Sequence, residues 1–319
     1  RLGPRALELT VHAPLAARKF RPGQFFRLQN FETYAPLVDG TRLQTEALAL
    51  YGTRVDRDKG LVSMIVVERG ASSRLVATLK PGDLVALMGP TGVRLKIPDD
   101  AETVLIIGDR LGVAPALATA AALRAHGGRV LYVGAFRTAA DIYCRDELEQ
   151  AADHVLWVTA TGDTLIPRRP GDAAATGDVI EALRRYAAGE LTRGAPPVAL
   201  PEVQRLIVTG GSGLVRRVRD ARQGELATLL CNAAHATASV STPMQCMLKG
   251  VCSQCLQWQI DPHTGHRTKA VFGCSWQDQP IDIVDLDNLE ERLGQNRLQE
   301  HLTDLWLDRI LTRHRIERA

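Results

Sequence analysis

Several features that would assign this sequence to a class are missing from it. No apolar run reaches the roughly 20 residues of a membrane-spanning helix, and the first residues lack the pattern of a signal peptide. Neither sign of charge dominates: 39 lysines and arginines stand against 36 acidic residues, a balance that argues against nucleic acid as a partner. We find no Ser/His/Asp or Cys/His constellation and no paired carboxylates suited to hydrolysis. We therefore expect a globular, cytoplasmic protein without a membrane span.

Cysteine is scarce, with 6 residues in 319, yet four of them crowd together late in the chain. Cys246, Cys252, Cys255 and Cys274 are separated by five, two and eighteen residues. Four thiolates suit a tetrahedral zinc ion or an iron–sulfur cluster. A zinc ribbon usually presents two Cys-x-x-Cys knuckles and this chain has one. The spacing therefore favours a [2Fe–2S] cluster over zinc and over unliganded cysteines.

The length of 319 residues indicates more than one domain. In residues 1–98, short alternating segments are separated by turns such as Pro22-Gly23 and Pro81-Gly82. The segments expected as strands are residues 7–11, 24–28, 47–51, 61–67 and 83–88. Short strands at this spacing predict a small antiparallel β-barrel.

One segment interrupts the strands with a turn and a short helix. Gly70, Ala71, Ser72 and Ser73 are small residues at the start of a helical run. The free backbone amides at such a start can receive a pyrophosphate. In the alternative interpretation, Ser72 or Ser73 is simply a helix N-cap.

Residues 99–240 change to strands that alternate with helices. Apolar strands are expected at residues 103–107, 129–134, 154–159 and 205–209, with helices ending near residues 125, 151 and 186. This alternation predicts a doubly wound parallel α/β sheet. Gly108 and the turn Gly210-Gly-Ser-Gly follow strands at the end where such sheets bind ligands. Similar glycine turns also occur in folds that bind no nucleotide.

The last part divides into a cysteine domain, residues 241–285, and a helical extension, residues 286–319. Asp287 is expected to cap one helix, with Glu290 as its capping-box partner. The apolar face of that helix would consist of Leu289, Leu293, Leu302, Leu305, Trp306 and Ile310. We expect this face to pack on the rest of the chain; the alternative is that it docks a partner.

In this order, the pieces resemble the electron-transfer subunit of dihydroorotate dehydrogenase and its relatives in the ferredoxin–NADP reductase superfamily. The resemblance covers most of residues 5–285. The matching stretches are Arg21-Pro-Gly-Gln-Phe, Gly70-Ala-Ser-Ser, Pro81-Gly-Asp, Met88-Gly-Pro-Thr-Gly, residues 108–115, Val133-Gly-Ala-Phe-Arg and the four cysteines. Pro243-Met-Gln-Cys looks most like a branch that joins this module to a flavoprotein resembling the glutamate synthase small subunit.

The resemblance implies three cofactors and a protein redox partner. It places FAD on the barrel, at Gly70, Ala71, Ser72 and Ser73, with Tyr51 stacking on the flavin ring. It places NAD(P) on the parallel sheet, at Gly108, Gly112, Ala114, Pro115 and Arg137. The four cysteines would hold the [2Fe–2S] cluster near the exit to the partner. That partner would be a glutamate synthase small-subunit-like flavoprotein or a dehydrogenase subunit, in a hetero-oligomer.

Two positions depart from the pattern of the family. Its barrel usually carries an Arg-x-Tyr/Phe-Ser motif for FAD, and residues 46–49, Glu-Ala-Leu-Ala, supply none of these groups. A second glycine expected after Gly108 is Asp109. A carboxylate at that place would repel a pyrophosphate unless Arg110 offsets its charge.

Three functions remain open from the sequence. The first is an electron-transfer subunit that passes electrons between NAD(P)H, FAD and a [2Fe–2S] cluster, to or from a partner protein. The second is a degenerate scaffold that bears the cluster within a larger redox complex. The third is a zinc-stabilised interaction protein. Glu46 and Asp109 favour the second function over the first, and the cysteine spacing disfavours the third.

Overall fold

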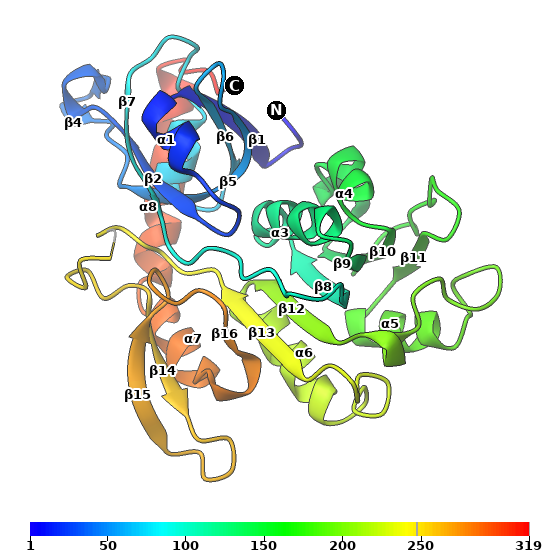
Figure 1. The fold of residues 1–319 in the computed structure, drawn as a ribbon. Coiled ribbons are helices and arrows are strands. Elements are labelled where there is room, and N and C mark those ends of the chain that lie inside the picture. The colour runs from blue at the N-terminus through cyan, green and yellow to red at the C-terminus, as the bar shows by residue number, and fades with distance from the viewer. Residues whose placement is uncertain (247, 319) are drawn as a thin grey trace.

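The computed structural model describes residues 1–246 and 248–318. An antiparallel sheet comes first, a parallel sheet with helices on both faces follows, and a hairpin and two helices end the chain (Figure 1). The last helix extends from the C-terminal part of the molecule to the antiparallel unit and packs against it (Figure 1). Among the described residues, no helix combines the length and the apolar character needed to cross a membrane.

The antiparallel sheet has five strands. In spatial order they are β1 (Ala6–His12), β6 (Leu61–Val67), β5 (Leu48–Asp56), β2 (Phe25–Asn30) and β7 (Val85–Thr91). Alternating residues such as Phe26, Leu28, Val62 and Met64 point into one core, as the period of two predicts. The sequence predicts a closed barrel; in the described residues the edge strands β1 and β7 do not pair, so the strands form an open sheet.

Short elements decorate this sheet. They are α1 (Pro14–Lys19), the hairpin of β3 (Leu37–Val38) and β4 (Thr41–Arg42), and α2 (Ala71–Val76). The short helix expected after the Gly70 turn is therefore confirmed as α2.

The second sheet has seven strands, of which the first six run parallel. In spatial order they are β11 (Ala173–Thr176), β10 (His154–Thr159), β9 (Arg129–Phe136), β8 (Thr103–Asp109), β12 (Arg205–Gly210), β13 (His235–Val240) and the antiparallel β16 (Gln279–Pro280). The chain moves from β8 to one side through β9, and later returns to the other side of β8 through β12. The strand order therefore reverses between β8 and β12, which is where ligands bind in such sheets.

Helices cover both faces of the parallel sheet, as the alternation of elements predicts. On one face, α3 (Val113–Ala125) and α4 (Arg145–Ala151) pack on Val104, Ile106 and Tyr132. On the other face, α5 (Val179–Ala187) and α6 (Ser212–Gln223) pack on Leu105, Ile107 and Leu131. Strands buried on both faces read as continuous apolar runs, which explains why they could be found in the sequence.

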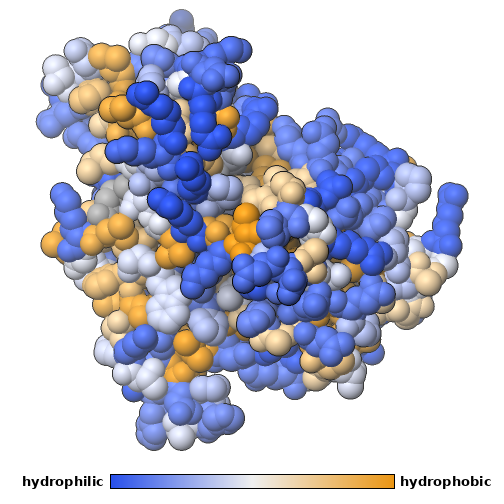
Figure 2. Space-filling model, viewed as in Figure 1, coloured by the Kyte–Doolittle hydropathy of each residue, from blue (hydrophilic) through white to orange (hydrophobic). Residues whose placement is uncertain are grey.

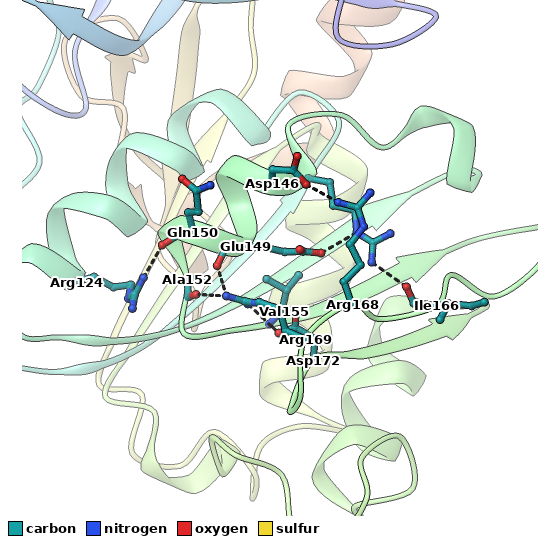
Figure 3. A network of polar contacts seen from close by, with 11 residues as sticks. Arg124, Asp146, Glu149, Gln150, Ala152, Val155, Ile166, Arg168, Arg169 and Asp172 are labelled. Carbon is teal, nitrogen blue, oxygen red and sulfur yellow. Dashed lines mark hydrogen bonds and ion pairs between the residues drawn. The ribbon is translucent and has the colours of Figure 1, made fainter.

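A polar network fixes the connection between β10 and β11 (Figure 3). Arg169 donates to both carboxylate oxygens of Asp172, each at 2.8 Å, and to the carbonyl of Ala152 at 3.2 Å. Asp172 in turn accepts the amide of Val155 at 2.8 Å. These bonds join the loop to the end of α4 and to β10 at the outer edge of the sheet.

The C-terminal part contains a hairpin, β14 (Leu256–Ile260) and β15 (Arg267–Phe272), and two helices, α7 (Leu286–Gly294) and α8 (Arg297–Arg313). The prediction of one helix capped by Asp287 is wrong. The first helix, α7, ends at Gly294, so the region contains two helices rather than one. The N-cap of α7 is Asp285, whose side chain accepts the amide of Asn288 at 3.0 Å.

The predicted apolar face of this region is only partly buried. Leu289 and Ile310 are buried, and Leu307, Ile310 and Leu311 pack against Leu75 of α2. The exposed apolar residues of α8 are Leu298, Leu302, Leu305 and Trp306, with exposed fractions of 65%, 55%, 53% and 40%. For Leu302, Leu305 and Trp306, which belong to the predicted face, the expectation of packing on the same chain is wrong. On the face seen in Figure 2, hydrophobic residues gather along the left and centre, and hydrophilic residues cover most of the right side.

Candidate functional site

A cleft of about 800 Å³ opens between the two sheets, at the point where the strand order reverses. The ends of β8, β9 and β12 contribute Asp109, Arg137 and Gly211, and α7 contributes Leu293. Arg5 and Arg69 reach the cleft from the antiparallel unit. A volume of this size suits a cofactor-sized ligand.

Four arginines give the cleft an excess of positive charge. The side chains of Arg5, Arg69, Arg110 and Arg137 line it and make no hydrogen bond or ion pair with any described residue. The carboxylates of the cleft, in contrast, are both engaged. Asp141 accepts from the amide and hydroxyl of Thr138 at 3.1 and 2.9 Å. The groups left for a ligand are therefore guanidinium groups, which suit phosphates.

Asp109, the last residue of β8, turns its carboxylate onto backbone amides. One oxygen accepts from Leu111 at 2.8 Å and from Gly112 at 3.1 Å, and the other accepts from Gly211 at 2.8 Å. Gly112 is the N-cap residue of α3, and Gly211 is the N-cap residue of α6. The carboxylate therefore lies between the N-termini of two helices.

Glycines make the room that this side chain occupies. Gly210 has φ +145°, which L-residues rarely adopt, and a Cβ there would collide with the carboxylate. A Cβ at Gly211 would come within 3.3 Å of an Asp109 oxygen. Gly112 has a different task, because a Cβ there would strike the backbone of Thr209 and push α3 away from β12.

The pKa of Asp109 reflects competing influences. Burial raises it above the usual value, while the amides of Gly211, Leu111 and Gly112 and the charge of Arg69 lower it. The sequence assigns the compensating charge to Arg110; in the structure, Arg69 is the arginine that favours the ionised carboxylate.

The other residues predicted to bind NAD(P) have different positions. Arg137 lines the cleft, and the Gly112 amide faces it through Asp109. Ala114 and Pro115 are buried within α3, and Gly108 lies against the hydroxyl groups of Tyr132 and Thr209. Sequence reasoning missed the remaining lining residues, namely Arg5, Arg69, Thr138, Asp141, Thr161, Ser212 and Ser241. Of these residues, only Ser212 belongs to a motif recognisable in the sequence, the glycine turn after β12.

The four clustered cysteines lie near one another as two pairs. Cys252 acts on the pKa of the Cys246 thiol, and beside burial, Cys274 and the charge of Cys252 act on the pKa of the Cys255 thiol. Within residues 1–246 and 248–318, no three His, Cys, Asp or Glu side chains gather around one point suited to a single metal ion. Adjacent thiol pairs match the donor set of a two-iron cluster, in which each iron takes two protein ligands.

The loop around Cys246 directs backbone amides at its sulfur. The amide of Cys252 lowers the pKa of the Cys246 thiol to about 7, assisted by the amides of Val251 and Lys249 and opposed by burial. Leu248 and Ser253 have positive φ, 65° and 52°. Such conformations cost energy in residues other than glycine and concentrate at functional sites. In contrast, burial raises the pKa of Cys255 to about 12.

Glu46 fixes this loop to the antiparallel unit. Its carboxylate accepts from the side-chain amide of Gln245 at 2.6 Å, and Arg27 donates to the carbonyl of Gln245 at 2.7 Å. Gln277, beyond Cys274, adds a second attachment through the Val93 amide at 2.5 Å and the Gly23 carbonyl at 3.0 Å. Glu46, which departs from the family's FAD motif, thus has a structural partner beside the first cysteine.

Tyr51 lies where the three units meet. It packs against buried residues of the parallel-sheet unit and also against the group that contains Cys255 and Cys274. Its ring is tilted on Phe25, with centroids 6.0 Å apart, and its hydroxyl lies 3.2 Å from the hydroxyl of Ser239 in β13. Burial raises its pKa, so the phenol stays protonated. Stacking on a flavin remains a prediction for this residue.

The turn before α2 is partly occupied by its own side chains. The Ser73 hydroxyl accepts the amides of Arg69 and Gly70 at 2.9 and 3.1 Å, and the Ser72 hydroxyl accepts the amide of Glu46 at 3.0 Å. The N-cap of α2 is Gly70, so the expectation that Ser72 or Ser73 is the N-cap is wrong; Ser73 lies at the third helical position and bonds back to the Gly70 amide. The amides of Ala71, Ser72 and Ser73 have no acceptor among the described residues. Their role toward FAD remains a prediction.

Comparison with known proteins adds relatives of two kinds. No family model matches the chain. An uncharacterized protein of Rickettsia prowazekii (strain Madrid E) is 31% identical over 303 residues, which cover 95% of this chain and 32% of that protein. The electron transfer subunit of dihydroorotate dehydrogenase B (NAD(+)) from Bacillus cereus (strain B4264) is 25% identical over 181 residues, 56% of this chain and 63% of that subunit. The chain thus spans about a third of the first relative and less than two thirds of the second.

Solved structures agree on the fold. A chain of the NADH-dependent reduced ferredoxin–NADP oxidoreductase superposes with a TM-score of 0.69 at 20% identity, covering 95% of this chain and 93% of that one. The ferredoxin reductase of carbazole 1,9a-dioxygenase gives 0.52 at 19% identity, over 75% and 66%. The chain is therefore a distant homologue of the dihydroorotate dehydrogenase electron-transfer subunit and has the fold of ferredoxin–NADP reductase-like FAD/NAD-binding proteins. The likeness to the glutamate synthase branch is not among these findings and remains a prediction.

Proposed function

We propose that this chain is an electron-transfer subunit that passes electrons between a nicotinamide dinucleotide, FAD and a [2Fe–2S] cluster, to or from a partner protein. One observation carries the proposal: the arginine-lined cleft and the paired cysteines adjoin the same strand end. Ser241, which lines the cleft, lies two residues beyond Ser239, which contacts Tyr51, and Tyr51 packs beside Cys255 and Cys274. A donor site and an acceptor site are thus held close together.

The cleft supports NAD(P) as the ligand. It lies at the reversal point of a parallel sheet, has cofactor size and offers four guanidinium groups that pair with no side chain in residues 1–246 and 248–318. The name of the Bacillus cereus relative includes NAD(+), and the name of the ferredoxin–NADP oxidoreductase includes NADH and NADP. We assign the dinucleotide to residues 99–240, with Arg137 among its contacts.

The cysteines support a [2Fe–2S] cluster in residues 241–285, held by Cys246, Cys252, Cys255 and Cys274. Their two pairs, the amides directed at Cys246 and the burial of Cys255 and Cys274 suit such a group. When bound, a nicotinamide supplies two electrons as hydride, a cluster carries one electron at a time, and a flavin connects the two. The protein's task is to hold these groups close together and to limit their contact with water.

FAD is proposed for residues 1–98, on the basis of the fold and of the relatives. The amides of Ala71, Ser72 and Ser73 are the groups proposed to meet its pyrophosphate, and Tyr51 is proposed to meet the ring. Residues 286–319 would form an extension whose exposed apolar residues lie outside this arrangement. The relatives named as an electron transfer subunit and as an oxidoreductase support a protein redox partner in a hetero-oligomer.

A second function has its own support. Glu46 is bonded to Gln245 and Asp109 to backbone amides, so two groups expected near nucleotides serve the protein itself. A scaffold that carries the cluster and binds no nucleotide would have the same features.

Anaerobic purification under iron-replete conditions separates these functions. The visible spectrum, with iron, sulfide, zinc and flavin analysis, should show a cluster and a flavin, and NADH or NADPH should reduce them. A cluster without flavin, and without nicotinamide binding in calorimetry, would favour the scaffold. Stoichiometric zinc without iron would overturn both.

A further inference from the structure

Asp109 satisfies the amides that a bound phosphate would otherwise use. Two of its three bonds come from the turn between β8 and α3, and the third comes from the start of α6. Amides at helix N-termini are anion sites, because they lack partners within the helix and face the positive end of the helix dipole. Here two such ends, those of α3 and α6, converge on one carboxylate.

The surroundings are shaped for this carboxylate. Gly210 and Gly211 leave the space that it fills, and Arg69 adds a favourable charge. The Gly112 amide also donates to the main-chain carbonyl of Asp109 at 2.9 Å, so the Leu111 and Gly211 amides depend most on the side chain. An amide proton makes one strong bond at a time, so a ligand phosphate must displace the Asp109 carboxylate before these amides can receive it. The four arginines of the cleft are not engaged in this way and stay open to a ligand.

We propose that Asp109 is a built-in anion that closes the turn to phosphates and leaves the arginines of the cleft to hold them. This inference deepens the proposed function and rests on it for the identity of the ligand. It makes Asp109 a specificity-determining residue: a dinucleotide binds here with its phosphates on guanidinium groups, and its affinity falls steeply with salt.

Simple charge repulsion would also weaken phosphate binding, and the cleft offers a matched control. Asp141 lines the same cleft with a carboxylate bonded to Thr138 and to none of the three turn amides. If repulsion dominates, Asp141→Asn and Asp109→Asn each relieve it. If occupancy dominates, Asp109→Gly opens the turn, Asp109→Asn frees the Gly211 amide that the second carboxylate oxygen holds, and Asp141→Asn opens nothing.

The test uses the protein as purified and inorganic pyrophosphate as the probe, in calorimetry at low salt. Asp109→Gly should bind pyrophosphate at least about 10-fold more tightly than the parent, because charged acceptors gain strongly from freed amides. Asp109→Asn should gain less, since its oxygen can keep the Leu111 and Gly112 amides. Asp141→Asn should stay within about 2-fold of the parent.

Thermal melting gives a second readout. Asp109→Gly should melt below the parent, and pyrophosphate should raise its melting temperature more than that of the parent. If Asp109→Gly fails to fold, the two asparagine variants are compared instead. A larger gain in pyrophosphate affinity for Asp109→Asn than for Asp141→Asn supports occupancy. Equal gains for the two, or no gain for a folded Asp109→Gly, would overturn the proposal.

This outcome is separable from that of the proposed function. Pyrophosphate binding requires neither flavin, nor cluster, nor hydride transfer. If Asp109→Gly gains pyrophosphate binding while no variant binds NADH or NADPH, the inference about Asp109 holds and the nicotinamide function fails. If the parent is reduced by NADH but Asp109→Gly gains nothing, the reverse is true.

Discussion

An acidic residue stands beside the cysteine region and another stands in the cleft, each where the resembled family has a different residue, and the two act differently. Glu46 holds the cysteine loop from outside, through Gln245, and leaves the four thiols free to act as ligands. Asp109 takes up the backbone groups that a ligand of the cleft would use. Glu46 therefore supports the cysteine site, whereas Asp109 restricts ligand binding in the cleft.

This difference indicates how the two sites can diverge in one fold. A cluster site depends on side chains that can be counted in the sequence. A dinucleotide turn depends on backbone amides, which any nearby carboxylate can occupy. The cysteine region should therefore lose function only through its ligands and anchors, while the cleft should gain phosphate binding when one side chain is removed.

The largest effect is expected when a cysteine of the cysteine region is replaced. Cys252→Ser should bleach the protein and remove most of its iron and sulfide, because Cys252 adjoins both thiol pairs. Cys231→Ser is the control, since Cys231 is exposed and outside the four. Iron and sulfide content equal to that of the parent in Cys252→Ser would remove this residue from the ligand set.

The next effect concerns the flavin prediction. Ser72→Glu places a negative charge at the start of α2 and should weaken flavin retention on the order of 10-fold or more, equivalent to about 1.4 kcal/mol. Ser72→Ala, which removes only the acceptor of the Glu46 amide, should retain flavin better. Flavin content measured after gel filtration tests this. If Ser72→Glu retains as much flavin as the parent, the pyrophosphate lies elsewhere.

A smaller effect sharpens the role of Glu46. Glu46→Ala should free Gln245 and speed the loss of iron in air roughly three-fold, as expected for one exposed hydrogen bond. Glu46→Gln keeps an acceptor and should fall between the parent and Glu46→Ala. Bleaching rates measured at equal protein concentration provide the check. Equal rates for all three would mean that Glu46 does not anchor the loop.

Local patterns predicted much of the fold. The apolar strands β8, β9, β10 and β12 are recognisable because they are buried on both faces. The helix that the sequence predicts to end near residue 186 is confirmed as α5, and the carboxylate of its N-cap, Asp178, accepts the amides of Ile180 and Glu181. The four cysteines could be grouped from their spacing alone.

Tertiary contacts account for what the sequence did not reveal. The direction of Asp109 depends on Gly211, which is 102 residues away and marked only by a common glycine turn. Arg5 and Arg69 reach the cleft from the antiparallel unit, and no local sequence pattern predicts that they lie there. The break between α7 and α8 did have a local signal, because Gly294 and Asn296 are residues that often end helices.

The smallest expected effect tests the helix that touches both regions. In α7, Leu293 lines the cleft, and Arg292 donates to the carbonyls of Leu256 and Ser253, which lie on either side of Cys255. The start of α7 is held by Asp285, which accepts the Asn288 amide and also pairs with Arg267 at 2.9 Å.

Asp285→Ala should therefore cost about 1 kcal/mol of unfolding free energy, the usual effect of removing an N-cap acceptor. Asp287→Ala should cost less than about 0.5 kcal/mol, because Asp287 is exposed and makes only a surface ion pair with Arg216. Urea unfolding of both variants compares the two residues directly. If Asp287→Ala proves the more costly, α7 starts at the residue that the sequence suggested. If Asp285→Ala also lowers both pyrophosphate affinity and cluster retention, the structures of the cleft and of the cysteine region depend on each other through α7. The two sites would then differ in the groups that bind their ligands, but they would not be structurally independent.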